Sequence, residues 1–259
     1  MPLTVVARRE TIVDAINSFK ATYHDDYYLV NGLARQYLVD PIEEKAALLA
    51  DALAGALVNW GAGSRRAPNV RPVSELKKAL LALPFHKSLL EFSGGALATM
   101  TIIGGRTRMI GGAVGHLVFD ASLLAVLSHI STRLLIGNTN VTYPMKALLL
   151  LTGFMPALDS QVRRGLSSAG FPGTSATRFR MPEDNGSLEA RKLTRLPFYL
   201  GECFATNKAL LTSAAIESNY PWLADEPGRL LDVLMFMQGS MAAPLFAFTP
   251  RVPRWHALP

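Results

Sequence analysis

Two residues whose side chains could do chemistry flank an apolar segment and a turn in KALLLLTGFMPALDSQVRRGL, residues 146–166. Asp159 follows the turn and precedes a helix-like stretch, so its carboxylate can cap the N–H groups that begin that helix. A carboxylate in such a place can also stabilise a positive charge that develops during a reaction, and can orient or deprotonate a water molecule. Lys146 opens the apolar segment. Its amine could act as a nucleophile that forms a Schiff base, or its stem could simply pack along the helix.

The stretch LDSQVRR, residues 158–164, resembles the V-D-T-H-V-x-R segment of the helix-hairpin-helix superfamily of DNA glycosylases. The resemblance is confined to residues 146–164 and implies that Asp159 is the catalytic aspartate. It places Lys146 near the lysine of the bifunctional members, although closer to Asp159 than the family's lysine stands. The family's glycine-containing hairpin is absent, because Thr142 and Pro144 stand where its two glycines would be.

A glycosylase must take its target base out of the duplex, which requires stacking side chains and a wedge for the vacated space. Five aromatic residues near these segments could serve, and each could equally be part of the core. They are Trp60, Tyr143, Phe154, Phe171 and Phe179.

Arginines occur in pairs beside Gly, Ser and Thr, the setting in which guanidinium groups bind phosphate oxygens. The alternative for each pair is a solvated surface. Together they predict a surface that contacts double-stranded DNA. The pairs are Arg65 and Arg66, Arg106 and Arg108, Arg163 and Arg164, and Arg178 and Arg180.

Composition sets the class of protein. The net charge of +6 suits a polyanionic partner, and the 49% of hydrophobic residues indicates a folded chain. The single cysteine, Cys203, excludes an internal disulfide and a thiolate metal site. No apolar run reaches the roughly 20 residues that cross a bilayer. We therefore expect a cytoplasmic, monomeric protein that needs no metal and no cofactor and does not bind a membrane.

The elements that must position these residues are mostly helices. Residues 41–60 and 117–136 have the composition and spacing of helices, and residues 167–186 form a long loop rich in Gly, Pro and Ser. Residues 94–115 could be a loosely capped helix or a small hairpin. The predicted fold is all-α: a compact bundle of many helices, 1–259, resembling the two-lobed fold of the glycosylase superfamily. Its lobes would be about 1–136 and 137–259, flanking a cleft.

The leading hypothesis is a monofunctional DNA glycosylase-like enzyme that removes a damaged or modified base. Endogenous damage and modified foreign DNA, such as phage DNA, are equally open as targets. One alternative is a non-catalytic helical protein that binds DNA or another partner. A second is a helical enzyme that acts on a small molecule.

Overall fold

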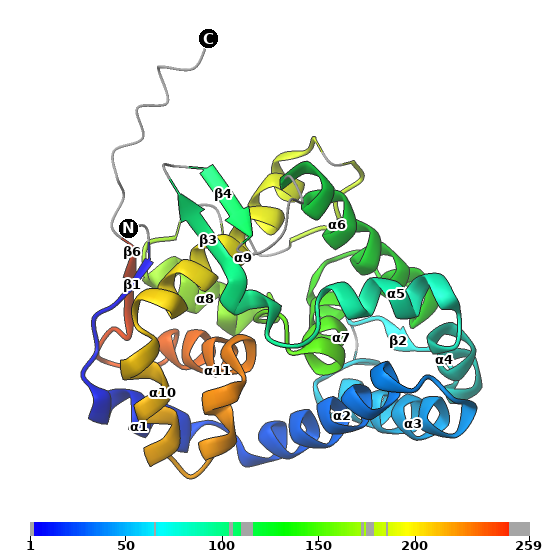
Figure 1. Cartoon of the computed structure of the whole chain (residues 1–259), viewed down its shortest axis with the longest axis horizontal. Helices are drawn as coiled ribbons and strands as arrows, with labels where there is room; N and C mark the ends of the chain where they lie inside the picture. The colour runs from blue at the N-terminus through cyan, green and yellow to red at the C-terminus, as the bar shows by residue number, and fades with distance from the viewer. Residues whose placement is uncertain are drawn as a thin grey trace.

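The computed structural model describes residues 3–64, 66–103, 106–109, 116–171, 174, 179–184 and 186–248. For the described residues from 102 to 117 inclusive, it describes the backbone alone. The prediction of a mostly α-helical fold is confirmed (Figure 1). The α-helices are α1 Arg9–Ser18, α2 Ala21–Val39, α3 Glu43–Asn59, α4 Val73–Leu80, α5 Leu83–Glu91, α6 His116–Arg133, α7 Thr142–Thr152, α8 Ser160–Ser168, α9 Leu188–Thr206, α10 Lys208–Glu217 and α11 Pro227–Gln238. Two 3-10 helices, η1 Ala96–Thr99 and η2 Pro221–Asp225, complete the helical elements.

Six short strands form three two-stranded antiparallel ladders in the described residues. The strands are β1 Leu3–Val5, β2 Asn69–Val70, β3 Met100–Ile103, β4 Arg106–Met109, β5 Leu135–Ile136 and β6 Phe246–Phe248. The ladder β3–β4 pairs Met100 with Met109 and Ile103 with Arg106. Of the two structures expected for residues 94–115, the described part adopts the hairpin, preceded by the short helix η1.

The chain folds back on itself, so that its two described ends meet. β1 pairs with β6, with Leu3 opposite Phe248, and α1 packs on α10 and α11. Figure 1 shows α1 beside α10 and α11, while α2 to α5 lie on the other side of the molecule. The first residues therefore pack with the C-terminal helices. A division near residue 136 does not follow these contacts.

α7 packs among α2, α3, α5 and α6. Every residue from Tyr143 to Thr152 is buried, which agrees with its nearly continuous apolar sequence. The helix ends at Gly153, whose φ of 67° is a left-handed conformation that glycine adopts without strain. The chain then turns through residues 154–159 into α8. No helix among the described residues is long and apolar enough to cross a membrane.

Candidate active site

The turn between α7 and α8 borders a cavity of about 270 Å³. Elements from both sides of the molecule form it: the end of α1, the first turn of α2, the end of α3, α7, the turn itself and α11. Three predicted site residues, Asp159, Lys146 and Trp60, come together here. The full lining is Phe19, Tyr23, Trp60, Lys146, Ala157, Asp159, Gln161, Arg229, Asp232 and Phe236.

Asp159 is the N-cap of α8, as its sequence position predicts. Its Oδ1 atom accepts hydrogen bonds from the backbone N–H groups of Gln161 and Val162, both at 2.9 Å. Its Oδ2 atom has no protein donor among the described residues, and the side chain is partly exposed at the cavity. One oxygen therefore holds the helix while the other remains available to a ligand.

Lys146 is buried within α7 rather than solvated. Its Nζ atom donates to the backbone oxygen of Trp60 at 2.6 Å and lies 5.0 Å from the centre of the Tyr143 ring. Trp60 is the C-cap of α3, so the ammonium group lies at the negative end of that helix. Burial lowers the pKa of Lys146, while the carboxylates of Asp159 and Asp232 act in the opposite direction. The lysine thus supports the Trp60 wall of the cavity.

Four aromatic side chains form one wall of the cavity. The Tyr23 and Trp60 rings lie 5.7 Å apart, and the Phe19 and Phe236 rings meet edge to face at 5.2 Å. The indole N–H of Trp60 donates to Oδ2 of Asp26 at 3.0 Å, which fixes the plane of the ring. Such a wall can stack against a planar ligand.

Sequence reasoning missed two charged residues of α11 at this cavity. Arg229 donates through Nη1 to Oδ2 of Asp232 at 2.6 Å, and both residues are buried. Burial raises the pKa of Asp232 to about 6, although the Arg229 guanidinium lowers it. Burial also lowers the pKa of Arg229, against the carboxylate of Asp232. The available signal was GRLLD, residues 228–232, which places opposite charges three residues apart in an otherwise apolar helix.

The other predicted aromatic residues do not line the cavity. Phe154 is fully buried against Phe92 and Phe119, with ring centres 5.0 and 6.3 Å away, so it is a core residue. Phe171 and Phe179 are also buried. Tyr143 lies behind Lys146 and is hydrogen-bonded to Ser64, and burial raises its pKa.

The predicted arginines divide between the surface and the interior. Arg66, Arg164 and Arg180 are exposed. Arg163 is buried, and its Nε atom donates to the backbone oxygen of Asp159 at 3.3 Å, so it supports the turn instead of forming a solvated surface. Arg106 and Arg108 lie in β4, where the backbone alone is described, and Arg65 and Arg178 lie outside the described residues. Among the arginines whose side chains are described, Arg66, Arg163, Arg164 and Arg180 do not line the cavity.

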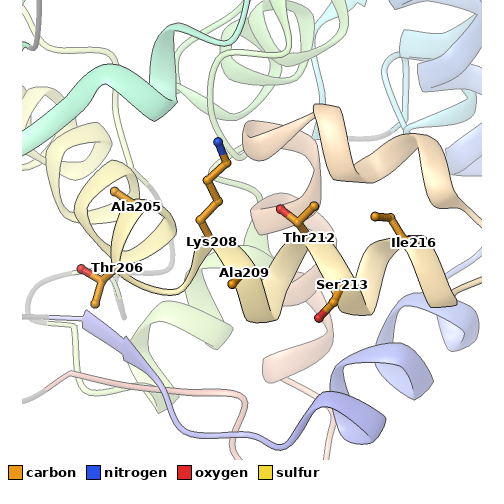
Figure 2. Close-up of a pocket in the computed structure, with 7 residues that line it drawn as sticks. All are labelled: Ala205, Thr206, Lys208, Ala209, Thr212, Ser213 and Ile216. Atoms are coloured by element: carbon orange, nitrogen blue, oxygen red, sulfur yellow. The ribbon is translucent and has the colours of Figure 1, made fainter.

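Two other pockets are weaker candidates for a reactive site. Figure 2 shows the larger one, of about 610 Å³, along α10, where the Lys208 side chain extends away from Ser213. Its described lining contains one cation and no carboxylate. A groove of about 500 Å³ between α2 and η2 contains two carboxylates: Tyr27 and Arg35 both bind that of Glu226, and Asp225 is exposed to solvent. The cavity at Asp159 is therefore the candidate site.

The described residues contain no group of three or more His, Cys, Asp or Glu side chains that could hold a metal ion. No protein-family model, no curated protein and no solved structure matches the chain.

Proposed function

We propose that this protein is a monofunctional DNA glycosylase-like enzyme that hydrolyses the N-glycosidic bond of a damaged or modified base. The observation that carries the proposal is the carboxylate of Asp159. One of its oxygens caps α8, the other is without a protein donor among the described residues, and the residue lines an aromatic-walled cavity. A preorganised carboxylate beside a stacking surface suits a reaction that builds positive charge on a sugar next to a planar leaving group.

In this mechanism the target nucleotide leaves the duplex and its base enters the cavity beside Tyr23 and Trp60. The bond between C1′ and the base nitrogen breaks, and its electron pair leaves with the base, which then takes up a proton. Oδ2 of Asp159 stabilises the cationic sugar and orients a water molecule. The water oxygen bonds to C1′ and gives up its proton to the Asp159 carboxylate, which passes it to solvent, and an abasic site is left. Lys146 supports the wall through its bond to the Trp60 carbonyl and takes no covalent part.

The proposed partner is double-stranded DNA. The net charge of +6 favours association with a polyanion, and exposed Arg66, Arg164 and Arg180 are available for phosphate contacts. The proposal includes a cytoplasmic monomer acting either on endogenous damage or on modified foreign DNA.

The first experiment screens for base release. Wild type and Asp159→Asn are incubated with duplexes that carry varied damaged and modified bases, and abasic sites are then quantified. Asparagine is a good N-cap residue, so this variant removes the negative charge while preserving the start of α8. Release by wild type and its loss in Asp159→Asn support the proposal, whereas equal release by both variants refutes the catalytic role of Asp159.

A second experiment needs no knowledge of the base. Binding is compared for a duplex with a neutral tetrahydrofuran abasic analogue and one with a protonated pyrrolidine analogue, which mimics the sugar cation. Wild type should prefer the pyrrolidine duplex by about tenfold, equivalent to about 1.4 kcal/mol. The preference should disappear in Asp159→Asn. Equal affinity of wild type for both duplexes would favour a non-catalytic DNA-binding protein, and no affinity for either would refute a DNA partner.

A further inference from the structure

One face of α11 packs along residues 153–165, the segment that contains Asp159. Residues 228, 232, 235 and 239 are spaced four, three and four apart, which places them on the same side of the helix. A Cβ on Gly228 would lie 2.1 Å from the backbone oxygen of Gly153, and one on Gly165 would lie 1.8 Å from that of Met235. Helix α11 therefore contacts the turn and α8 backbone to backbone, near both ends of the segment 153–165.

Between these two contacts, Asp232 holds the turn itself. Its Oδ1 atom accepts the backbone N–H of Ala157 at 2.9 Å, two residues before Asp159. Its Oδ2 atom accepts from Arg229 at 2.6 Å. Both carboxylate oxygens are thus occupied, and the residue is 5% exposed. Asp232 therefore binds the backbone of Ala157 and the side chain of Arg229, and neither of its oxygens is left for a ligand.

Arg229 makes the corresponding contacts with the aromatic wall. Its Nη2 atom donates to the backbone oxygen of Tyr23 at 2.7 Å. The guanidinium carbon lies 5.0 Å from the centre of the Phe19 ring and 5.2 Å from that of Trp60. The ion pair consequently connects the turn on one side of the cavity to the wall on the other.

Stability alone does not account for this pair. Removing two charges from water is costly, and apolar residues of similar volume often give an equal or greater free energy of unfolding. Apolar residues could not bond to the backbone of both Ala157 and Tyr23. We infer that Arg229 and Asp232 are positioning residues that hold the carboxylate of Asp159 against the aromatic wall. The reaction they serve rests on the proposed function.

The decisive variant removes both charges at once, as Arg229→Met with Asp232→Leu. We expect it to fold with a melting temperature close to or moderately below that of wild type, because no buried charge is left unpaired but the Ala157 N–H and the Tyr23 carbonyl lose their partners. Its preference for the pyrrolidine duplex should fall by about tenfold, since a displacement near 1 Å at a reacting centre has large effects. Amides of residues 153–165 should also exchange hydrogen faster, while those of α4 remain unchanged.

A matched control removes a surface ion pair, Lys77 with Glu43, as Lys77→Gln with Glu43→Gln. It should change neither the preference nor the exchange. If the double variant on α11 does not fold, Arg229→Lys replaces it: lysine keeps a cation beside Asp232 but lacks the fork that bonds both Asp232 and the Tyr23 carbonyl, so it should show the same two changes in smaller measure. A folded α11 variant with wild-type preference and wild-type exchange would overturn the inference. A third outcome is that wild type shows no preference for the pyrrolidine duplex while the α11 variant exchanges the amide hydrogens of residues 153–165 faster than wild type. That outcome would support the positioning role and refute the proposed function.

Discussion

At the scale of single residues, Asp159 shows how a cap and a candidate catalytic group can be the same side chain. The two N–H donors occupy one oxygen, and they hold the carboxylate in a fixed orientation. The residue also lines a cavity whose aromatic wall comes from other elements. Capping therefore supplies the preorganisation that electrostatic stabilisation of a cation requires.

Substitutions at Asp159 should separate the two roles. Asp159→Asn keeps an oxygen for the N–H groups of Gln161 and Val162, so its free energy of unfolding should stay close to that of wild type. Asp159→Ala loses the cap and should be destabilised by about 1 kcal/mol. Both variants should lose the preference for the pyrrolidine duplex. Denaturant unfolding and duplex binding measure these effects, and a large loss of stability in Asp159→Asn would contradict the separation.

Lys146 should form no covalent bond with DNA. Its buried Nζ atom donates to the Trp60 carbonyl, and moving it towards a sugar would leave that acceptor unpaired. Borohydride treatment during base release should therefore trap no protein–DNA adduct. Lys146→Met, which cannot form a Schiff base, serves as the background control. Trapping above this background would show that the lysine does leave its partner.

At the scale of elements, two glycines allow α8, the turn and α11 to approach closely. Gly165 meets Met235, and Gly228 meets Gly153 and Phe154, in each case through backbone oxygens that cannot easily move. Helix propensity does not explain Gly165 in α8, because glycine inside a helix lowers stability by about 1 kcal/mol relative to alanine. The close packing of the helices explains it.

Replacing Gly165 by alanine should therefore be severely destabilising. The new Cβ would lie 1.8 Å from the Met235 oxygen, so the two helices must separate. We expect a loss of about 3 kcal/mol or more in the free energy of unfolding. Gly55→Ala in α3 is the matched control, because nothing lies within 4 Å of its Cβ position. That variant should be stabilised by up to about 1 kcal/mol, and a similar outcome for both alanines would refute the packing argument.

At the scale of the whole molecule, local sequence signals predicted the helices and the cap, but tertiary contacts determined the rest of the site. The Asp159 cap and α3 follow from side-chain chemistry within one turn. Local patterns do not say which distant segments meet: the first residues pack with the C-terminal helices, and Arg163 is buried with its Nε atom bonded to the backbone of Asp159. The pairing of β1 with β6 joins segments from the two ends of the described chain. The hydrogen bond between Ala157 and Asp232 joins the α7–α8 turn to α11. No local sequence pattern encodes either contact.

His24 contacts both sides of the molecule and should make its stability depend on acid. Its ring stacks on Tyr220 of the α10–η2 connection at 3.9 Å and meets Phe19 at 5.0 Å. Burial, aided by the Arg229 cation, lowers the pKa of His24 to about 3. In the unfolded chain a histidine has a pKa of about 6.5, so between these values the unfolded state binds a proton that the folded state does not. The stabilisation is complete above about pH 6.5 and is lost as pH falls towards 3.

His24→Phe isolates this effect, because phenylalanine keeps the stacking and cannot take up a proton. Each pKa unit corresponds to about 1.4 kcal/mol, so wild type should lose a few kcal/mol more than the variant between pH 6.5 and pH 4. Asp232 acts with the opposite sign, since burial raises its pKa to about 6, but it is present in both proteins and cancels in the comparison. Denaturant unfolding at several pH values gives the two slopes. Parallel slopes would show that folding does not lower the pKa of His24 and would refute this prediction.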